Sequence, residues 1–265
     1  MPAPAAADAG LVAAWLEAEP EWRIARVFLP QAREARFEAW LAFEHALRET
    51  AWRVRDARVA QAKLGWWLEE IGHARAGAAR HPLLQRLLAL DALPAFADGG
   101  AERILRGAAH AVALESPADT DTLLAAFVAL EQPLAEARAR LAGMAATDVA
   151  GVRGLAAARV LAECRHWSRF ALPQRARLPL DLLARAGATR DAALEQGPAL
   201  SLALGDALMP RIEEALTAGT PAVLDEAALR IGRAIGRAHG GRARRFAGAQ
   251  LAFALWRLAR RQPRA

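Results

Sequence analysis

The chain has no tyrosine, one cysteine and one lysine among its 265 residues. Its single cysteine, Cys164, cannot form an internal disulfide and argues against thiol catalysis or a thiolate metal site. β-Branched residues are too sparse to build a sheet, whereas alanine, leucine, arginine and glutamate dominate, which predicts an all-α protein. No stretch of about 18 residues is free of charges or other breaks, so no membrane-spanning helix is predicted.

The N-terminal sequence lacks the features of a secretory signal. No basic segment precedes its first apolar run, and that run contains acidic residues. We therefore expect a cytoplasmic protein, either free or peripheral at the inner membrane surface.

The charge balance is basic, with a formal net charge of +6 and a pI near 11.0. Such a balance can indicate a nucleic-acid or anionic-lipid partner. However, Lys63 is the only lysine, and arginine together with abundant alanine is typical of a GC-rich genome. No nucleic-acid-binding motif accompanies the charge, so no nucleic-acid partner is expected.

The longest helical pattern runs from residue 37 to residue 71. Its first half places apolar side chains on one face: Phe37, Trp40, Leu41, Leu47, Ala51 and Val54. Glu44, Arg48 and Arg55 fall on the same face. A charge within an apolar stripe is costly unless it is paired or lines a polar cavity, so these three are candidate site residues. Glu44 and Arg48 also have the spacing of an ordinary helical ion pair.

A break near Asp56 is expected to divide this segment into two helices. Lys63 and Trp67 share one face of the second helix. They either line a cavity or pack together, with the lysine stem lying across the indole ring. The two helices together are the predicted wall of a binding cavity.

A second long helix is predicted from residue 147 to residue 170. One side of it is apolar, and another side carries Arg159, His166 and Arg169, with Arg165 nearby. This basic side has the chemistry to hold a phosphate, although an arginine-rich chain also produces such groupings by chance.

Other acidic residues are given structural roles. Asp119 and Asp121 follow Pro117 at a helix start, where capping is the expected role. Asp225 and Glu226 are adjacent, diverge in direction and are expected to be solvated.

No repeat, low-complexity linker or shift in composition divides the sequence, which predicts one domain of roughly ten or more helices over residues 1–265. Residues 1–30 are lead-in helices. Residues 230–265 contain ten arginines, one histidine and no acidic residue. This basic end either lies on an anionic membrane surface or forms two terminal bundle helices with a solvated basic face.

Four segments together resemble the squalene/phytoene synthase family of head-to-head prenyltransferases. They are FLP at 28–30, the segment from AFEH to WWLEEI at 42–71, RHPLLQRLLA at 80–89 and RARLPLDLLARAG at 175–187. The resemblance implies the all-α isoprenoid synthase bundle, with a central cavity that receives prenyl diphosphates.

Active members of that family carry two aspartate-rich motifs that bind Mg²⁺ on the diphosphate. Here, residues 48–55 stand in place of the first motif and contain no aspartate, and residues 164–179 stand in place of the second and contain no carboxylate. Because Mg²⁺ requires oxygen ligands, the resemblance implies a pseudoenzyme without a metal or other cofactor. The family also has non-catalytic members, one of which helps to assemble respiratory complex I.

Three hypotheses follow for the function. In the first, Mg²⁺-dependent prenyl transfer is lost, and the protein binds an isoprenoid diphosphate or an anionic lipid, or acts in assembly. Its candidate ligand residues are Glu44, Arg48, Arg55, Lys63, Trp67, Arg159, Arg165, His166 and Arg169. In the second, an active transferase joins prenyl diphosphates with Mg²⁺ held by Glu44, Glu49 or Glu163. In the third, side chains fill the cavity and the protein is a scaffold at a membrane surface.

Overall fold

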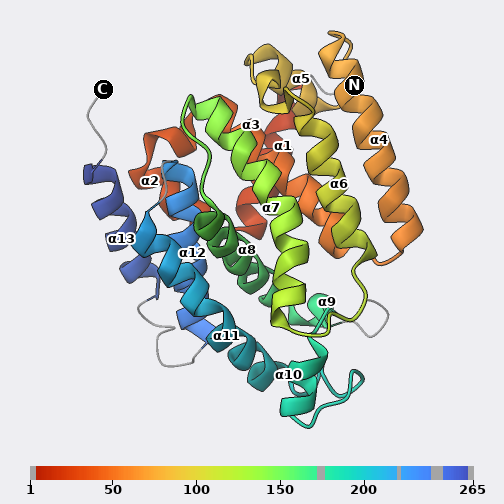
Figure 1. The fold of residues 1–265 in the computed structure, drawn as a ribbon. Helices are drawn as coiled ribbons and strands as arrows, with labels where there is room; N and C mark the ends of the chain where they lie inside the picture. The colour runs from red at the N-terminus through yellow and green to blue at the C-terminus, as the bar shows by residue number, and fades with distance from the viewer. Residues whose placement is uncertain (1–3, 172–176, 220–221, 240–246, 262–265) are drawn as a thin grey trace.

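The structure is a computed structural model that describes residues 4–171, 177–219, 222–239 and 247–261. Every regular element in these ranges is helical (Figure 1). The α-helices are α1 (Pro4–Ala18), α2 (Glu21–Phe28), α3 (Ala35–Arg48), α4 (Ala57–Arg75), α5 (Pro82–Ala89), α6 (Gly100–Ala113), α7 (Thr120–Ala142), α8 (Val149–Cys164), α9 (Trp167–Phe170), α10 (Leu180–Arg185), α11 (Gly197–Ala218), α12 (Val223–His239) and α13 (Ala247–Arg261). Short 3-10 turns form Pro30–Arg33 and Leu93–Phe96, and Glu49–Arg53 is a π-helical turn.

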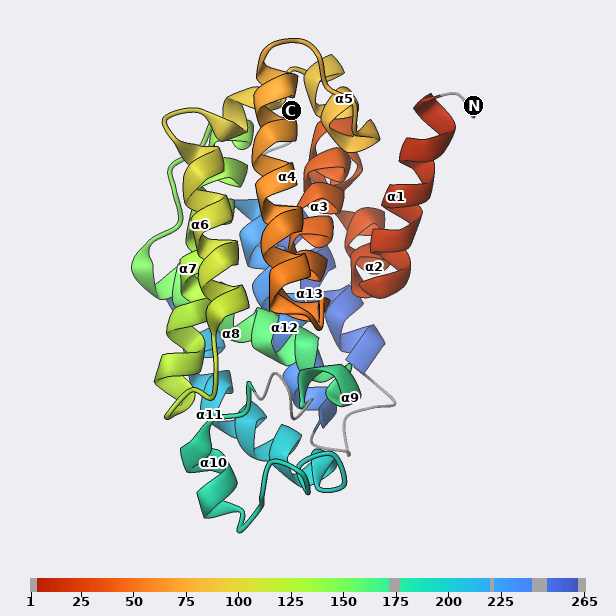
Figure 2. The ribbon, with the colours of Figure 1, turned by 90° about the vertical axis from the view of Figure 1, so that its right-hand side faces the viewer.

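Helix α8 lies at the centre of the bundle and packs against α7, α11 and α12 (Figure 1). Small residues allow this close approach. A Cβ at Gly232 on α12 would overlap Ala158 of α8, and a Cβ at Gly154 would overlap Ala215 of α11. On the other side of the bundle, α3 lies between α1 and α4 (Figure 2). The buried apolar side chains of both sides join in one continuous core.

Local sequence signals explain several helix boundaries. Asp56 begins α4 by accepting hydrogen bonds from the backbone N–H groups of Arg58 and Val59, at 2.7 and 3.2 Å. Asp119 begins α7 by accepting from the N–H of Thr122 at 2.7 Å, which is the predicted capping role. The predicted break near Asp56 is therefore confirmed, with a cap as its cause.

The predicted single helix over residues 147–170 is wrong. Helix α8 begins at Val149 and ends at Cys164. His166 then has a non-helical backbone (φ −101°, ψ 52°) before the short helix α9. A tertiary contact accounts for the end of the helix. The Trp167 indole donates a hydrogen bond to the Ala193 carbonyl at 2.9 Å, and its ring lies against Gly197 at the start of α11. Such a contact leaves no periodic signal in the sequence.

Candidate functional site

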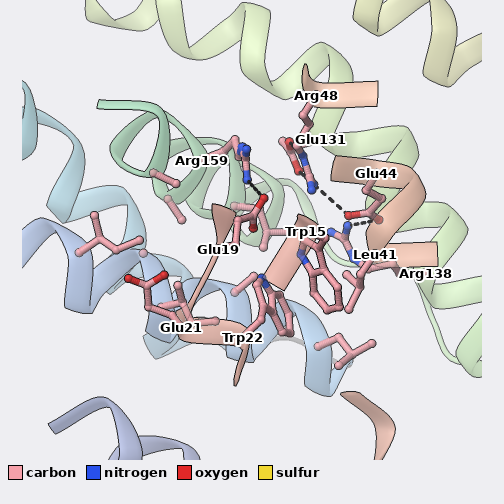
Figure 3. Close-up of a pocket in the computed structure, with 18 of the residues that line it drawn as sticks. Trp15, Glu19, Glu21, Trp22, Leu41, Glu44, Arg48, Glu131, Arg138 and Arg159 are labelled. Atoms are coloured by element: carbon pink, nitrogen blue, oxygen red, sulfur yellow. Dashed lines mark hydrogen bonds and ion pairs between the residues drawn. The ribbon is translucent and has the colours of Figure 1, made fainter. Parts of the chain in front are cut away.

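The predicted central cavity lies between α3, α7, α8, α12 and the turn that joins α1 to α2 (Figure 3). Its volume is about 50 Å³. Pockets that hold drug-sized ligands have volumes of about 300–1,000 Å³, so this cavity has room for water molecules but not for an isoprenoid chain. Paired charged side chains take up the surrounding space.

Arg48 is held by two carboxylates in the centre of the bundle. Its Nε and Nη2 atoms donate to the two carboxylate oxygens of Glu131, at 2.8 and 2.6 Å. Its Nη2 atom also lies 3.0 Å from Oε2 of Glu44, one turn earlier on α3. The predicted pairing of Glu44 with Arg48 is therefore present, and it is buried.

Glu44 connects this group to Arg138 on α7. It accepts hydrogen bonds from Nη1 of Arg138 and from the indole of Trp40, the latter at 2.7 Å. The Nε atom of Arg138 donates to Asp225 at 2.7 Å, and Asp225 also accepts from the hydroxyl of Thr147. Asp225 is fully buried, so its predicted solvation is wrong. The neighbouring charge of Arg138 and the Thr147 hydroxyl explain how α12 can bury a carboxylate.

Arg159 holds a third group of charges together. It donates to Glu19 at 2.8 Å and to Glu163 one turn further along α8. Glu163 also accepts from Nε of Arg53 at 3.2 Å, and His45 lies 3.2 Å from Glu19. We call these side chains the central ion-pair network: Glu19, Glu44, Arg48, Arg53, Glu131, Arg138, Arg159, Glu163 and Asp225.

The network keeps its members charged. Burial alone would raise the pKa of Glu19 and of Glu163. The Arg159 guanidinium instead holds the pKa of Glu19 well below the ordinary value of a glutamate, and it also lowers the pKa of Glu163. Burial likewise opposes the positive charge of Arg48, yet Glu131 and Glu44 raise its pKa. Each charge therefore depends on its partner in an apolar interior.

This arrangement does not fit a Mg²⁺ cluster. Each buried carboxylate of the network accepts hydrogen bonds from at least one guanidinium. A divalent cation would have to displace an arginine and then lie beside other arginines. Within the described ranges, no three acidic, histidine or cysteine side chains come together in a way that could hold a metal ion.

A larger cavity of about 810 Å³ lies between α1, α3, the π-helical turn and α4, and Arg53 of the network is among the residues that line it. Trp66, Trp67 and Leu11 form part of its apolar wall, and Arg55 and Lys63 contribute positive charge. We call it the α1–α3–α4 groove. The Trp67 ring also packs edge-on against Phe43 of α3, with 5.2 Å between ring centroids.

Arg55 does not join Glu44 and Arg48 on the face predicted for it. The π-helical turn of Glu49–Arg53 and the extended Val54 change the direction of the chain after α3. Arg55 is therefore exposed at the groove. A pattern that assumes 3.6 residues per turn cannot anticipate this shift.

The remaining candidates lie near the end of α8. Arg165 is half-buried and donates to both carboxylate oxygens of Glu21 at 2.7 Å. His166 is half-buried between α8 and α9. The side chain of Arg169 lies outside the described residues. Of the nine candidates, the structure thus brings Glu44, Arg48, Arg159 and Arg165 to the central cavity and Arg55, Lys63 and Trp67 to the groove.

Sequence reasoning missed Glu19, Glu131 and Arg138. Glu131 and Arg138 are seven residues apart on the buried face of α7, among apolar side chains such as Leu130, Leu134 and Leu141. The rule that selected Glu44, a charge within an apolar face, would have selected both. Glu19 lies in the turn after α1 and carries no periodic signal.

The basic C-terminal segment has two parts of different character. Helix α12 packs against α8 and α11 and is part of the bundle, whereas α13 covers α12 and α2. On α13, Phe253 and Trp256 are exposed and stacked, and the Arg260 guanidinium lies 4.5 Å from the Trp256 ring centroid. In the part of the chain that the structure describes, no helix has the length and apolar character needed to cross a membrane.

Neither a protein-family model nor a curated protein sequence matches this chain. Among solved structures, a crystal structure of a dehydrosqualene synthase in complex with ligand is similar, with a TM-score of 0.66 and 15% sequence identity. The similarity covers 98% of this chain and 98% of that chain. At this identity the likeness establishes the fold. The protein has an all-α, isoprenoid synthase-like fold, as the sequence predicts.

Proposed function

We propose that this protein has an isoprenoid synthase-like fold without Mg²⁺-dependent prenyl transfer, and that it binds an isoprenoid diphosphate or a related amphipathic anion, either as a carrier or in assembly. The observation that supports the proposal is the central ion-pair network. Ionisation of an allylic diphosphate requires strong stabilisation of charge on the leaving group, which clustered divalent cations provide. Here arginines occupy the carboxylates that would be needed to hold them.

The filled centre also argues against the binding of substrate there. Two prenyl chains must lie side by side for head-to-head coupling, and about 50 Å³ accommodates neither. Binding without turnover therefore requires another surface of the molecule.

The direct test measures pyrophosphate release from farnesyl or geranylgeranyl diphosphate with Mg²⁺, with an active squalene synthase as the positive control. We expect no release above the rate without protein. A parallel thermal melt with farnesyl diphosphate and EDTA is expected to show a concentration-dependent rise in Tm. Release at a rate comparable with the control enzyme would refute the proposal.

The alternative is an active prenyl-coupling transferase, and one observation favours it. Two carboxylates, Glu44 of α3 and Glu131 of α7, line the central cavity and contact the same guanidinium, that of Arg48. If substrate displaced the arginines, these groups would become metal ligands. Mg²⁺-dependent pyrophosphate release that is lost in Glu44→Gln and Glu131→Gln would establish this alternative.

A further inference from the structure

The α1–α3–α4 groove combines a large volume with positive charge that is not neutralised. Its one lining carboxylate, Glu49, is paired with Arg53 one turn away, and Arg53 also donates to Glu163. In the described part of the chain, Arg55 and Lys63 take part in no ion pair. The groove therefore has two exposed cations available to an anion.

The groove also has an apolar wall, to which Trp66 and Trp67 contribute. Trp66 is 40% exposed, although it contacts Trp67 with 5.1 Å between ring centroids. Leu11 of α1 and Val54 contribute to the same wall. An exposed tryptophan beside other apolar side chains and two free cations suits a ligand with an apolar tail and an anionic head.

We infer that the α1–α3–α4 groove binds a single-chain isoprenoid diphosphate, with the diphosphate held by Arg55 and Lys63 and the chain lying against Trp66 and Trp67. The inference rests on the proposed function and names the site for it. A volume of about 810 Å³ lies within the range for a ligand of this size, whereas a two-chain phospholipid would extend well beyond it. The small central cavity takes no part in this binding.

Isothermal titration with farnesyl diphosphate in EDTA tests the inference on the full-length protein. The test variant is Arg55→Glu with Lys63→Glu, since both side chains are exposed and their reversal leaves the core intact. Its charge control is Arg190→Glu, an exposed arginine between α10 and α11. Trp66→Ala tests the apolar wall, and its control is Leu68→Ala, which is also exposed on α4.

We expect the double charge reversal to weaken binding by about tenfold or more, and Trp66→Ala to weaken it several-fold, while both controls match the wild type. Inorganic pyrophosphate and farnesol, which supply the head and the tail alone, are each expected to bind more weakly than farnesyl diphosphate. Pyrophosphate binding as tight as that of farnesyl diphosphate would overturn the role of the apolar wall.

Two failures can be told apart. If the wild type binds farnesyl diphosphate and the groove variants bind it equally well, the groove is not the site, but the proposed binding function stands. If the wild type does not bind it, or turns it over with Mg²⁺, the proposed function fails and the inference fails with it.

Discussion

The centre of the bundle and the α1–α3–α4 groove both contain charged residues from α3 and its neighbours, yet they use charge in opposite ways. In the centre, Arg48 and Arg138 are buried and each contacts two carboxylates. At the groove, Arg55 and Lys63 are exposed and unpaired among the described residues. Charge that is neutralised by the protein stabilises one arrangement of the helices, whereas charge left open to solvent is available to a ligand. The comparison makes predictions that differ sharply between the two regions.

The largest effect is expected from breaking the central ion-pair network. Arg138→Met would leave Glu44 and Asp225 as buried charges without this partner and should lower the free energy of unfolding by about 3–5 kcal/mol. Urea denaturation followed by circular dichroism measures it. The matched control adds Glu44→Gln and Asp225→Asn to Arg138→Met, which removes the stranded charges and should restore part of the loss. If the triple variant is no more stable than the single one, stranded charge is not the cause.

A smaller effect is expected from acid. Because the folded protein holds the pKa of Glu19 and Glu163 below their ordinary value, the unfolded chain binds more protons in acid and stability falls as the pH drops. Glu70 lies outside the network, and its burial alone would raise the pKa of its carboxyl group. Hydrogen bonds from His81 and Arg80 outweigh the burial and lower this pKa from 4.5 to about 2 in the folded protein. Glu70 therefore also loses its contribution to stability as the pH falls from 4.5 to about 2.

We expect a loss of about 2 kcal/mol or more between pH 7 and pH 3, measured as urea midpoints across that range. Glu163→Gln should make the dependence less steep, because one of the titrating groups is removed. A profile as steep in Glu163→Gln as in the wild type would show that the network does not control the acid response.

A third experiment asks whether charge outside both regions dominates binding to membranes. The exposed face of α13 carries Phe253 and Trp256 beside Arg257 and Arg260, which is the composition of a helix that rests on an anionic surface. We predict that Trp256→Ser with Arg257→Glu lowers flotation with phosphatidylserine vesicles about tenfold, and that Arg55→Glu with Lys63→Glu changes it less. The reverse order of effects would assign membrane contact to the groove.

The smallest effect is expected for the stability of the groove variants. The free energy of unfolding of the Arg55→Glu, Lys63→Glu variant should lie within about 0.5 kcal/mol of the wild-type value, because exposed side chains without partners contribute little to stability. Urea denaturation beside Arg138→Met gives the contrast directly. A loss comparable with that of Arg138→Met would mean that these cations are structural, and the distinction between the two regions would disappear.

The sequence predicted the helices better than their connections. Apolar periodicity located α3 and α4, and Asp56 and Asp119 act as the caps that their positions suggest. It could not show that α8 ends at Cys164, because a contact between Trp167 and the Ala193 carbonyl redirects the chain there. It also placed Arg55 on the wrong face, because a π-helical turn precedes it.

The candidate residues were predicted in part, for a physical reason. A charge inside an apolar stripe is visible in the sequence, so Glu44 and Arg48 were selected. Their more distant partners, Glu131 and Arg138, lie more than eighty positions away in the sequence, and pairing at that separation is not periodic. The expectation that Asp225 is solvated failed for the same reason.

By itself, the sequence determined an all-helical protein and the positions of most helices, since composition and spacing are local properties. Only the tertiary structure decided which carboxylate meets which arginine, that the centre is filled and that open space lies beside Lys63 and Trp66. Those outcomes depend on helices that are distant in the chain and adjacent in space, where the low dielectric of the interior makes each unpaired charge costly.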